Sequence, residues 1–191
     1  MTLVEKIATR RELIDVAMGM GPPDLLIRDG KLVNVHTSEI YHEDIAVKRG
    51  RIAYVGDEEK LKVTSHTKII DARGKYVTPG LVDTHIHLYH TQLNMTQVAR
   101  VLLPHGTTAV ADGFYASGIV AGIKGIKFCL EEIKRTPLKI VFLASATAHY
   151  QNRDLGLPTT PNAPTFEDIL MMLDWPDCHG IEEPQYTPIT N

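Results

Sequence analysis

The spacing of apolar residues changes twice along the chain, and each change predicts a different kind of structure. Apolar side chains first recur at near-helical intervals, which predicts a helix over residues 3–18 that ends at Gly19. Short strand-like runs follow, and after residue 78 buried-looking strands alternate with helical segments. We therefore expect an N-terminal helical segment (1–23), a small β-sandwich portion (24–78) and an α/β domain (79–191).

Three turns divide the β-rich stretch into strand pairs. Asp29-Gly30 is a strong hairpin signal, and Arg49-Gly50 and Ala72-Arg73-Gly74 occupy equivalent places between β-forming runs. Strands on either side of such turns commonly pair with each other. The sequence therefore predicts three pairs, which join residues 24–28 to 31–35, 44–48 to 51–56, and 67–71 to 75–78.

Strands and helices alternate after Pro79-Gly80. Repeats of this length favour right-handed βαβ units and a parallel sheet. The predicted strands are 81–87, 106–112, 139–144 and 177–181, and the predicted helices are 95–103, 119–134 and 166–173.

Composition excludes several classes of protein. The chain has 20 basic and 23 acidic residues, a net charge of −3, which argues against a nucleic-acid-binding surface. Its apolar runs are shorter than the roughly 20 residues of a membrane helix, and its charged N-terminus is unlike a signal peptide. Two cysteines suit a reducing compartment. We expect a cytoplasmic protein that binds neither nucleic acid nor membrane.

His85 and His87 are the strongest candidates for chemistry. Side chains at positions i and i+2 of a strand point to the same side, so two imidazoles at the end of a strand can converge on one point. Imidazole binds zinc, iron and manganese. An isolated pair of this kind is a weak signal, but its place at the end of a buried strand makes it a candidate metal site.

The nine residues around this pair resemble a known family signature. Residues 79–87, PGLVDTHIH, resemble the opening signature of the amidohydrolase superfamily, P-G-[LF]-[VI]-D-x-H-x-H. Residues 11–19, 24–35, 38–41 and 99–108 are similar to the adenine deaminase family within it. The resemblance implies an α/β fold: the first half of a metal-dependent (β/α)8 barrel, preceded by a small β-sandwich portion and an N-terminal helix. It also implies that His85 and His87 bind metal.

The resemblance extends to a glutamate after the fourth barrel strand. Gly180-Ile181-Glu182-Glu183 corresponds to the family's G-L-G-E, so Glu183 takes the place of the carboxylate that bridges two divalent ions, which would be zinc, manganese or iron. Glu182 stands where that family has a glycine. Taken without the resemblance, the two glutamates are typical of an exposed acidic loop.

Two segments depart from the family pattern. After the paired histidines the family has an acidic residue and two serines, whereas this chain has Leu88-Tyr89-His90-Thr91. The family's Asp-Pro-His-Glu is replaced by Asp112-Gly113-Phe114-Tyr115. Both segments follow barrel strands, where barrel enzymes keep their substrate contacts, and aromatic rings there can stack on a flat heterocycle. The candidate substrate-binding residues are Tyr89, His90, Asp112, Phe114, Tyr115 and His149.

The other histidines are assigned structural or solvent-exposed roles. His105 precedes a strand, at the end of the barrel that contributes to stability. A single histidine at the rim is also commonly a hydrogen-bonded surface group, which is the alternative for His90 and His149. The remaining histidines are His36, His42, His66 and His179.

The barrel segment is short. A complete barrel needs about 250 residues, and residues 79–191 are fewer than half of that. The family's later ligands, two histidines and an aspartate that is also the general base, have no counterpart in this sequence. We therefore expect a second polypeptide to complete the barrel and to carry the general base. It is a separate subunit, the other piece of a cleaved precursor, or the remainder of a truncated chain.

The expected activity is hydrolysis of a C–N bond in a cyclic amidine or amide by metal-activated hydroxide. If the substrate is adenine, the products are hypoxanthine and ammonia. Two alternatives stay open: a hydrolase that opens a cyclic amide or imide ring, and a non-catalytic regulatory or scaffolding subunit. A bound metal would separate the enzymes from the scaffold.

Overall fold

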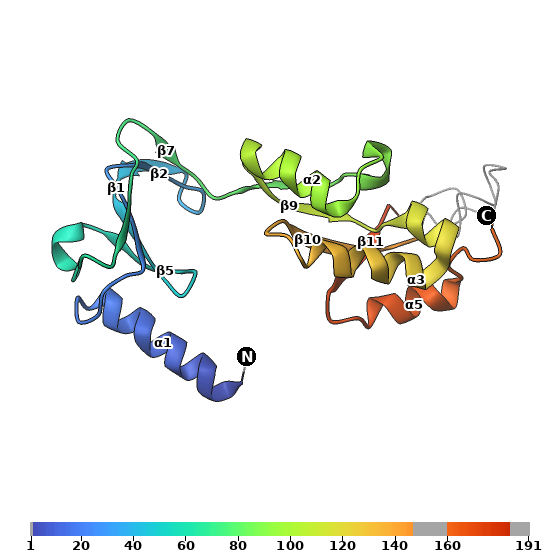
Figure 1. Ribbon diagram of the computed structural model, residues 1–191, viewed down its shortest axis with the longest axis horizontal. Coiled ribbons are helices and arrows are strands. Elements are labelled where there is room, and N and C mark those ends of the chain that lie inside the picture. Colours follow the sequence, from blue (N-terminus) through green and yellow to red (C-terminus); the bar gives the residue numbers. More distant parts are fainter. Residues whose placement is uncertain (1, 147–159, 184–191) are drawn as a thin grey trace. The chain divides into compact units, whose positions relative to one another are not determined.

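The computed structural model describes residues 2–146 and 160–183, so His149 lies outside the described residues. Figure 1 labels the elements along the chain. Two compact units divide it, residues 1–79 and 80–191, and each is described by itself. None of the helices in the described ranges has the length and apolar character needed to cross a membrane.

The first unit contains two small sheets, a helix and a single 3-10 turn. One sheet has the strand order β5-β4-β1-β6, and the other has the order β3-β2-β7. Their bounds are β1 (Leu25–Arg28), β2 (Lys31–Asn34), β3 (Glu39–His42), β4 (Asp44–Lys48), β5 (Arg51–Gly56), β6 (Lys68–Asp71) and β7 (Tyr76–Val77), with η1 (Glu58–Lys60) after β5.

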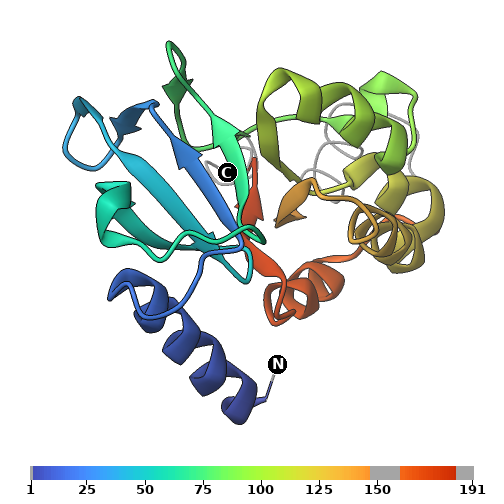
Figure 2. The same ribbon diagram turned by 60° about the vertical axis from the view of Figure 1, so that its left-hand side comes forward.

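Helix α1 (Leu3–Ala17) forms where the sequence predicts it. Thr2 and Glu5 make a capping box at its start, and Gly19, with a φ of 69°, follows its end in the left-handed region that glycine tolerates best. The helix packs on β5 and β4, and its only buried residue is Val16 (Figure 2).

Of the three predicted strand pairs, only the second is confirmed. β4 and β5 form an antiparallel hairpin, with Lys48 opposite Arg51. Arg49 and Gly50 both have positive φ, as a type I′ turn requires.

The other two predicted pairs are wrong, because the chain changes sheet at each turn. β1 pairs with β4 and β6, whereas β2 pairs with β3 and β7. Asp29 turns with a φ of 61°, and its N–H donates to Asp44 Oδ1 at 2.9 Å. Pairing with distant strands buries Leu26 completely. The residues of a local turn give no information about the stability gained by burying Leu26 between distant strands.

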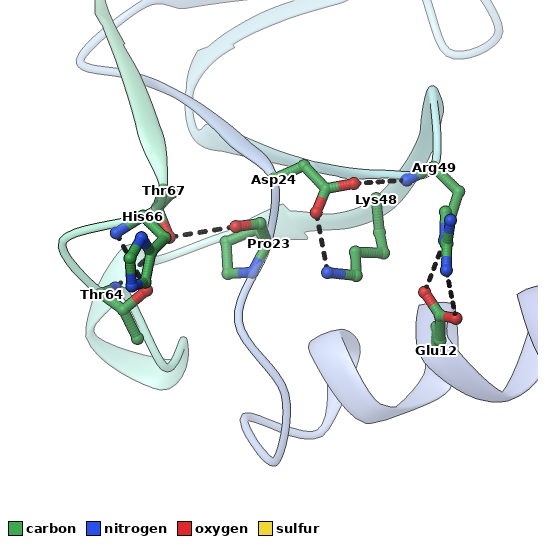
Figure 3. A network of polar contacts seen from close by, with 8 residues as sticks. All are labelled: Glu12, Pro23, Asp24, Lys48, Arg49, Thr64, His66 and Thr67. Carbon is green, nitrogen blue, oxygen red and sulfur yellow. Dashed lines mark hydrogen bonds and ion pairs between the residues drawn. The ribbon is translucent and has the colours of Figure 1, made fainter.

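Polar contacts join α1 to the first sheet (Figure 3). Asp24 accepts hydrogen bonds from Lys48 Nζ at 2.7 Å and from the Arg49 N–H at 2.8 Å, and Arg49 binds Glu12 through two nitrogens at 2.9 and 3.1 Å. The bond from Lys48 lowers the pKa of the Asp24 carboxyl. These charged contacts hold the β4–β5 turn against the helix.

The second unit is a four-stranded parallel sheet with the order β11-β10-β9-β8, and helices connect successive strands. This arrangement, with the β-rich unit and helix that precede it, confirms the predicted fold class. The strands are β8 (Leu81–Asp83), β9 (Thr107–Asp112), β10 (Lys139–Ser145) and β11 (Cys178–Glu182); the helices are α2 (Met95–Leu102), α3 (Tyr115–Ile133) and α5 (Phe166–Leu173), with η2 (Leu88–Thr91) and η3 (Leu103–His105).

The core of this unit lies between the sheet and its helices (Figure 2). Phe142 of β10 is fully buried and stacks between Phe114 and Trp175, with ring centroids 6.3 and 5.7 Å away. Burial of such large apolar side chains is the main force that holds helices to a sheet. The other buried members include Val98, Val110, Ile126, Leu130, Ile133, Ile169 and Met172.

Two element boundaries differ from the prediction. α3 begins at Tyr115 rather than residue 119 and contains a kink at Gly122, whose φ is 63°. β8 ends at Asp83, so His85 and His87 follow the strand instead of belonging to it. The expected alternation of side chains along a strand therefore does not apply to this pair.

The edges of the sheet expose apolar side chains. Within the described ranges, β8 pairs with β9 alone and β11 with β10 alone. Leu81 and Val82 of β8 are 59% and 55% exposed, and Ile181 of β11 is 47% exposed. Unpaired edges with apolar side chains are surfaces that proteins normally cover.

Gly113 is predicted to tolerate no side chain, because β10 and β11 pack against its Cα. The Cβ of an alanine at this position would lie 2.8 Å from the Leu143 carbonyl oxygen and would overlap a carboxylate oxygen of Glu182. We expect Gly113→Ala to destabilise the chain by about 1–3 kcal/mol, the usual cost of overpacking. Urea unfolding monitored by circular dichroism measures this.

Gly118→Ala is the matched control. Its Cβ would meet side-chain atoms only, Ile126 Cδ1 at 3.1 Å and Pro164 Cγ at 3.3 Å, and no backbone atom, and alanine favours the α3 helix. Equal stability of the two variants would contradict the packing described for Gly113.

Candidate metal centre

The two histidines of the HxH segment face each other just beyond the end of β8. Their Nε2 atoms are 3.3 Å apart, and the His85 N–H donates to Asp83 Oδ1 at 3.1 Å. The His85 side chain is 54% exposed and that of His87 is 23% exposed. Both imidazoles thus present the same ring nitrogen to one point at the carboxyl end of the sheet.

Glu183 reaches this point from the opposite edge of the sheet. It directly follows β11, and its φ of 39° turns the chain sharply. Its Oε1 lies 2.7 Å from His85 Nε2, and its Oε2 lies 3.7 Å from His87 Nε2. The structure therefore brings together the three residues that the sequence selects as metal ligands.

The spacing of these atoms suits a metal ion. One ligand atom from each of the three residues lies within 4.8 Å of the other two. Zinc bound tetrahedrally at about 2.0–2.2 Å separates its ligand atoms by roughly 3.3 Å. The two imidazole nitrogens and the carboxylate are also the donor types that zinc, manganese and iron accept.

A second polar cluster lies beneath the first and is buried. Asp112 of β9 is 0% exposed and Glu182 of β11 is 3% exposed, and an oxygen of each lies within 4.8 Å of a His87 ring nitrogen. Asp112 accepts hydrogen bonds from the N–H groups of Leu88 and Phe114, each at 2.7 Å. Glu182 Oε1 accepts from the Gly113 N–H at 3.1 Å.

Burial dominates the electrostatics of this cluster. Desolvation raises the pKa of the Asp112 carboxyl, and the backbone donors and His87 oppose that shift only in part. Desolvation and the neighbouring charge of Asp112 raise the pKa of Glu182. Positive charge near His87 would favour the ionised form of both carboxyls.

Aromatic residues line the exposed side of the centre. The Tyr89 hydroxyl contacts that of Tyr115, and the Tyr89 ring lies 4.0 Å from the His90 ring and 5.9 Å from the His87 ring. Burial raises the pKa of the Tyr89 phenol above its ordinary value. Tyr89, His90 and Tyr115 are thus the predicted substrate-binding residues that lie beside the paired histidines.

The remaining predicted substrate-binding residues lie elsewhere. Asp112 and Phe114 are buried, at 0% and 3% exposure, and Phe114 belongs to the core. Asp112 uses both carboxylate oxygens to hold the backbone that follows β8 and β9. His149 falls outside the described residues. The structure therefore gives Asp112 an architectural position beneath the centre.

An apolar cavity of about 600 Å³ adjoins Tyr89 on the helical side. It runs between the start of α2 and the exposed side of α3, and its walls include Leu93, Met95, Val120 and Phe128. The cavity contains few polar groups, so it is a hydrophobic recess beside the centre rather than part of the ligand cluster.

Glu182 is the functional candidate that the sequence analysis missed. As one of two adjacent glutamates it resembles an exposed acidic pair, but the structure buries it while Glu183 stays 35% exposed. The available signal was the alternation of a β-strand, which points successive side chains to opposite sides. An acidic pair at the end of a strand must place its members in different surroundings.

Comparison with known proteins identifies relatives over most of the chain. The chain is 37% identical over 173 residues to the adenine deaminase of Ruegeria sp. and 37% identical over 182 residues to that of Moorella thermoacetica. These matches cover 90% and 91% of this chain but 28% of each relative. The chain thus spans little more than a quarter of the length of these relatives.

Solved structures match less of the fold. D-hydantoinase (dihydropyrimidinase) from Thermus sp. is 21% identical, with a TM-score of 0.49, and the match covers 70% of this chain and 30% of that chain. The amidohydrolase family model matches residues 68–114, which include His85, His87 and Asp112. The resemblance to the amidohydrolase superfamily, and to adenine deaminases within it, is therefore confirmed for this chain.

Proposed function

We propose that this chain provides metal ligands for an amidohydrolase that breaks a C–N bond in a cyclic amidine or amide. The observation that carries the proposal is the convergence of His85, His87 and Glu183 on one point. The similarity to adenine deaminases supports it. The donor set fits a divalent ion, which His85, His87 and Glu183 would hold.

A bound divalent ion lowers the pKa of water to about 7 and so supplies hydroxide at neutral pH. Within this chain, His85 and His87 would hold the ion and Glu183 would add negative charge beside it. Tyr89 offers a hydroxyl that can donate to a polar atom of the substrate, and burial raises its pKa further above the neutral range. The general base belongs to the polypeptide that completes the barrel.

Adenine is the substrate we propose, because the relatives that match nine-tenths of this chain are adenine deaminases. Water adds to the ring carbon that bears the amino group, and the C–N bond breaks as nitrogen takes up a proton. The products are hypoxanthine and ammonia. Tyr89 and Tyr115 beside His87 offer aromatic faces for a flat ring.

Ring opening of a cyclic amide is a second candidate. The segment after β9 carries Phe114-Tyr115 where the adenine deaminase pattern has His-Glu, and Phe114 lies in the core. The loss of those two polar groups removes contacts that a purine would use. A hydantoin or cyclic imide needs fewer polar contacts and suits the aromatic rim equally well.

We further propose that additional polypeptide covers the open edges of the parallel sheet. The support is the exposure of Leu81, Val82 and Ile181 on edge strands. This polypeptide is either a separate subunit or the continuation of a longer chain. A regulatory or scaffolding role is the remaining alternative for this chain, and it does not require the metal ligands.

His85→Ala and His87→Ala test the metal assignment. Each variant removes one of the three side chains that converge on the candidate metal site. We therefore expect each to lose stoichiometric zinc or manganese from the complete protein and to lose turnover of adenine. Metal content by plasma mass spectrometry and ammonia release with adenine, hydantoins and cyclic imides measure the two effects.

His105→Ala is the matched control. This histidine ends η3, next to the amino end of β9 and away from the carboxyl end where the ligands gather. It should keep its metal and its activity. Turnover that survives the loss of His85 and His87 would show that the centre is placed wrongly, and a complete protein without any metal would favour the scaffold.

Leu81→Thr combined with Val82→Thr tests the covering of the edge. If the strand edge is an interface, these polar replacements should weaken association with the completing polypeptide and reduce self-association of the 191-residue chain. Sedimentation velocity measures both. Val101→Thr, on the exposed side of α2 with 52% exposure, is the control and should change neither. A stable, active monomer of this chain alone would contradict the proposal.

A further inference from the structure

Three polar atoms without a hydrogen-bond partner gather at the buried side of the metal centre. Among the described residues, the buried side-chain atoms that lack a partner include His87 Nδ1, Ser145 Oγ and Glu182 Oε2. An unsatisfied buried polar atom costs about 1–3 kcal/mol, so native structures rarely keep one. One of these atoms belongs to the Glu182 carboxylate and the other two belong to residues beside it, so the carboxylate is placed to serve a partner close by.

The partner is identified by distance and register. Glu182 Oε1 lies 3.9 Å from His87 Nδ1, and Ser145 pairs with Glu182 across the neighbouring strands β10 and β11. A movement of about 1 Å would bring Glu182 Oε1 and His87 Nδ1 to hydrogen-bonding distance. The Gly113 N–H already donates to Glu182 Oε1 at 3.1 Å, and Gly113 has no side chain to exclude this carboxylate.

The chemistry of the two groups fixes the position of one proton. An ionised carboxylate only accepts hydrogen bonds, so a bond between it and His87 requires hydrogen on Nδ1. A neutral imidazole carries a single N–H, which leaves the lone pair on Nε2. Nε2 is the atom that faces His85 Nε2 at 3.3 Å and Glu183 Oε2 at 3.7 Å.

We propose that Glu182 is a positioning residue that holds His87 in the tautomer able to bind metal through Nε2. The proposal rests on the proposed function, because it gives Glu182 a role only if His87 is a ligand. The family that this chain resembles has a glycine at this place, so this carboxylate is an addition to the shared pattern. In many proteins a carboxylate that does not itself bind the metal orients a metal-binding histidine by accepting a hydrogen bond from its other ring nitrogen.

Asp112 does not take this role. Both of its oxygens already accept backbone hydrogen bonds, from Leu88 and Phe114 at 2.7 Å each. The alternative interpretation of this cluster is that it binds a second cation, since the ligand atoms of His87, Asp112 and Glu182 lie within 4.8 Å of one another. It would require Nδ1 to bind metal rather than carry hydrogen, and the experiment below separates the two.

Glu182→Gln and Glu182→Met are the test variants. Glutamine keeps the shape but removes the charge, and methionine removes the acceptor at similar length. The first readout is the ¹⁵N–¹H spectrum of the histidine rings in the full metal-free chain. We expect His87 to carry its hydrogen on Nδ1 in the parent chain. The population with hydrogen on Nε2 should increase in Glu182→Gln and increase further in Glu182→Met.

Zinc affinity, measured by competition with a chelator, is the second readout. Loss of the Glu182 carboxylate, which orients His87, is expected to weaken zinc binding about 10- to 100-fold. Ser145→Ala is the matched control, because it removes another buried polar group beside Glu182 but leaves the carboxylate in place. It should keep both the tautomer and the affinity, and thermal unfolding followed by circular dichroism verifies that each variant is folded.

The outcomes are distinct. An unchanged His87 tautomer in both Glu182 variants overturns the proposal, as does zinc affinity equal to that of the parent chain. A second equivalent of zinc that is lost with Glu182 overturns it in favour of the buried cation. If the complete protein binds no zinc at all, the proposed function fails, and the tautomer spectrum still decides whether Glu182 orients His87.

Discussion

The convergence of the two edge segments at the carboxyl end of the four-stranded parallel sheet is the constraint on which the centre depends. β8 and β11 lie at opposite edges, and a flat sheet would hold such strands about 14 Å apart. Yet His85, which follows β8, comes within 2.7 Å of Glu183, which follows β11. The segments that follow β8 and β11 therefore converge over the carboxyl end of the sheet, and the helices packed around Phe142 and its neighbours hold the strands beneath them.

The buried floor of the centre depends on the same sheet. Asp112, Ser145 and Glu182 end three successive strands, and each is at most 3% exposed. Backbone N–H groups of the segments after β8 and β9 hold two of these side chains. These side chains form a buried polar floor beneath His87, whereas the side chains of His85 and Glu183 are 54% and 35% exposed.

Sequence reasoning reached the parallel sheet, its helices and the three candidate ligands that the structure brings together, because strand–helix alternation and a short signature are local properties. It failed where distant contacts decide. β1 and β2 join different sheets although Asp29-Gly30 favours a hairpin, since pairing with β4 and β6 buries Leu26. Nor does the sequence Glu182-Glu183 by itself show which of the two glutamates is buried. That depends on which side of β11 faces the floor, which only the assembled strands determine.

Anomalous diffraction at the zinc absorption edge, from crystals of the zinc-loaded complete protein, is the most direct test of the account. The prediction is a strong peak within about 2.0–2.2 Å of His85 Nε2, His87 Nε2 and a carboxylate oxygen of Glu183. The account would be contradicted by a metal bound away from these three side chains, or by a His87 that binds it through Nδ1.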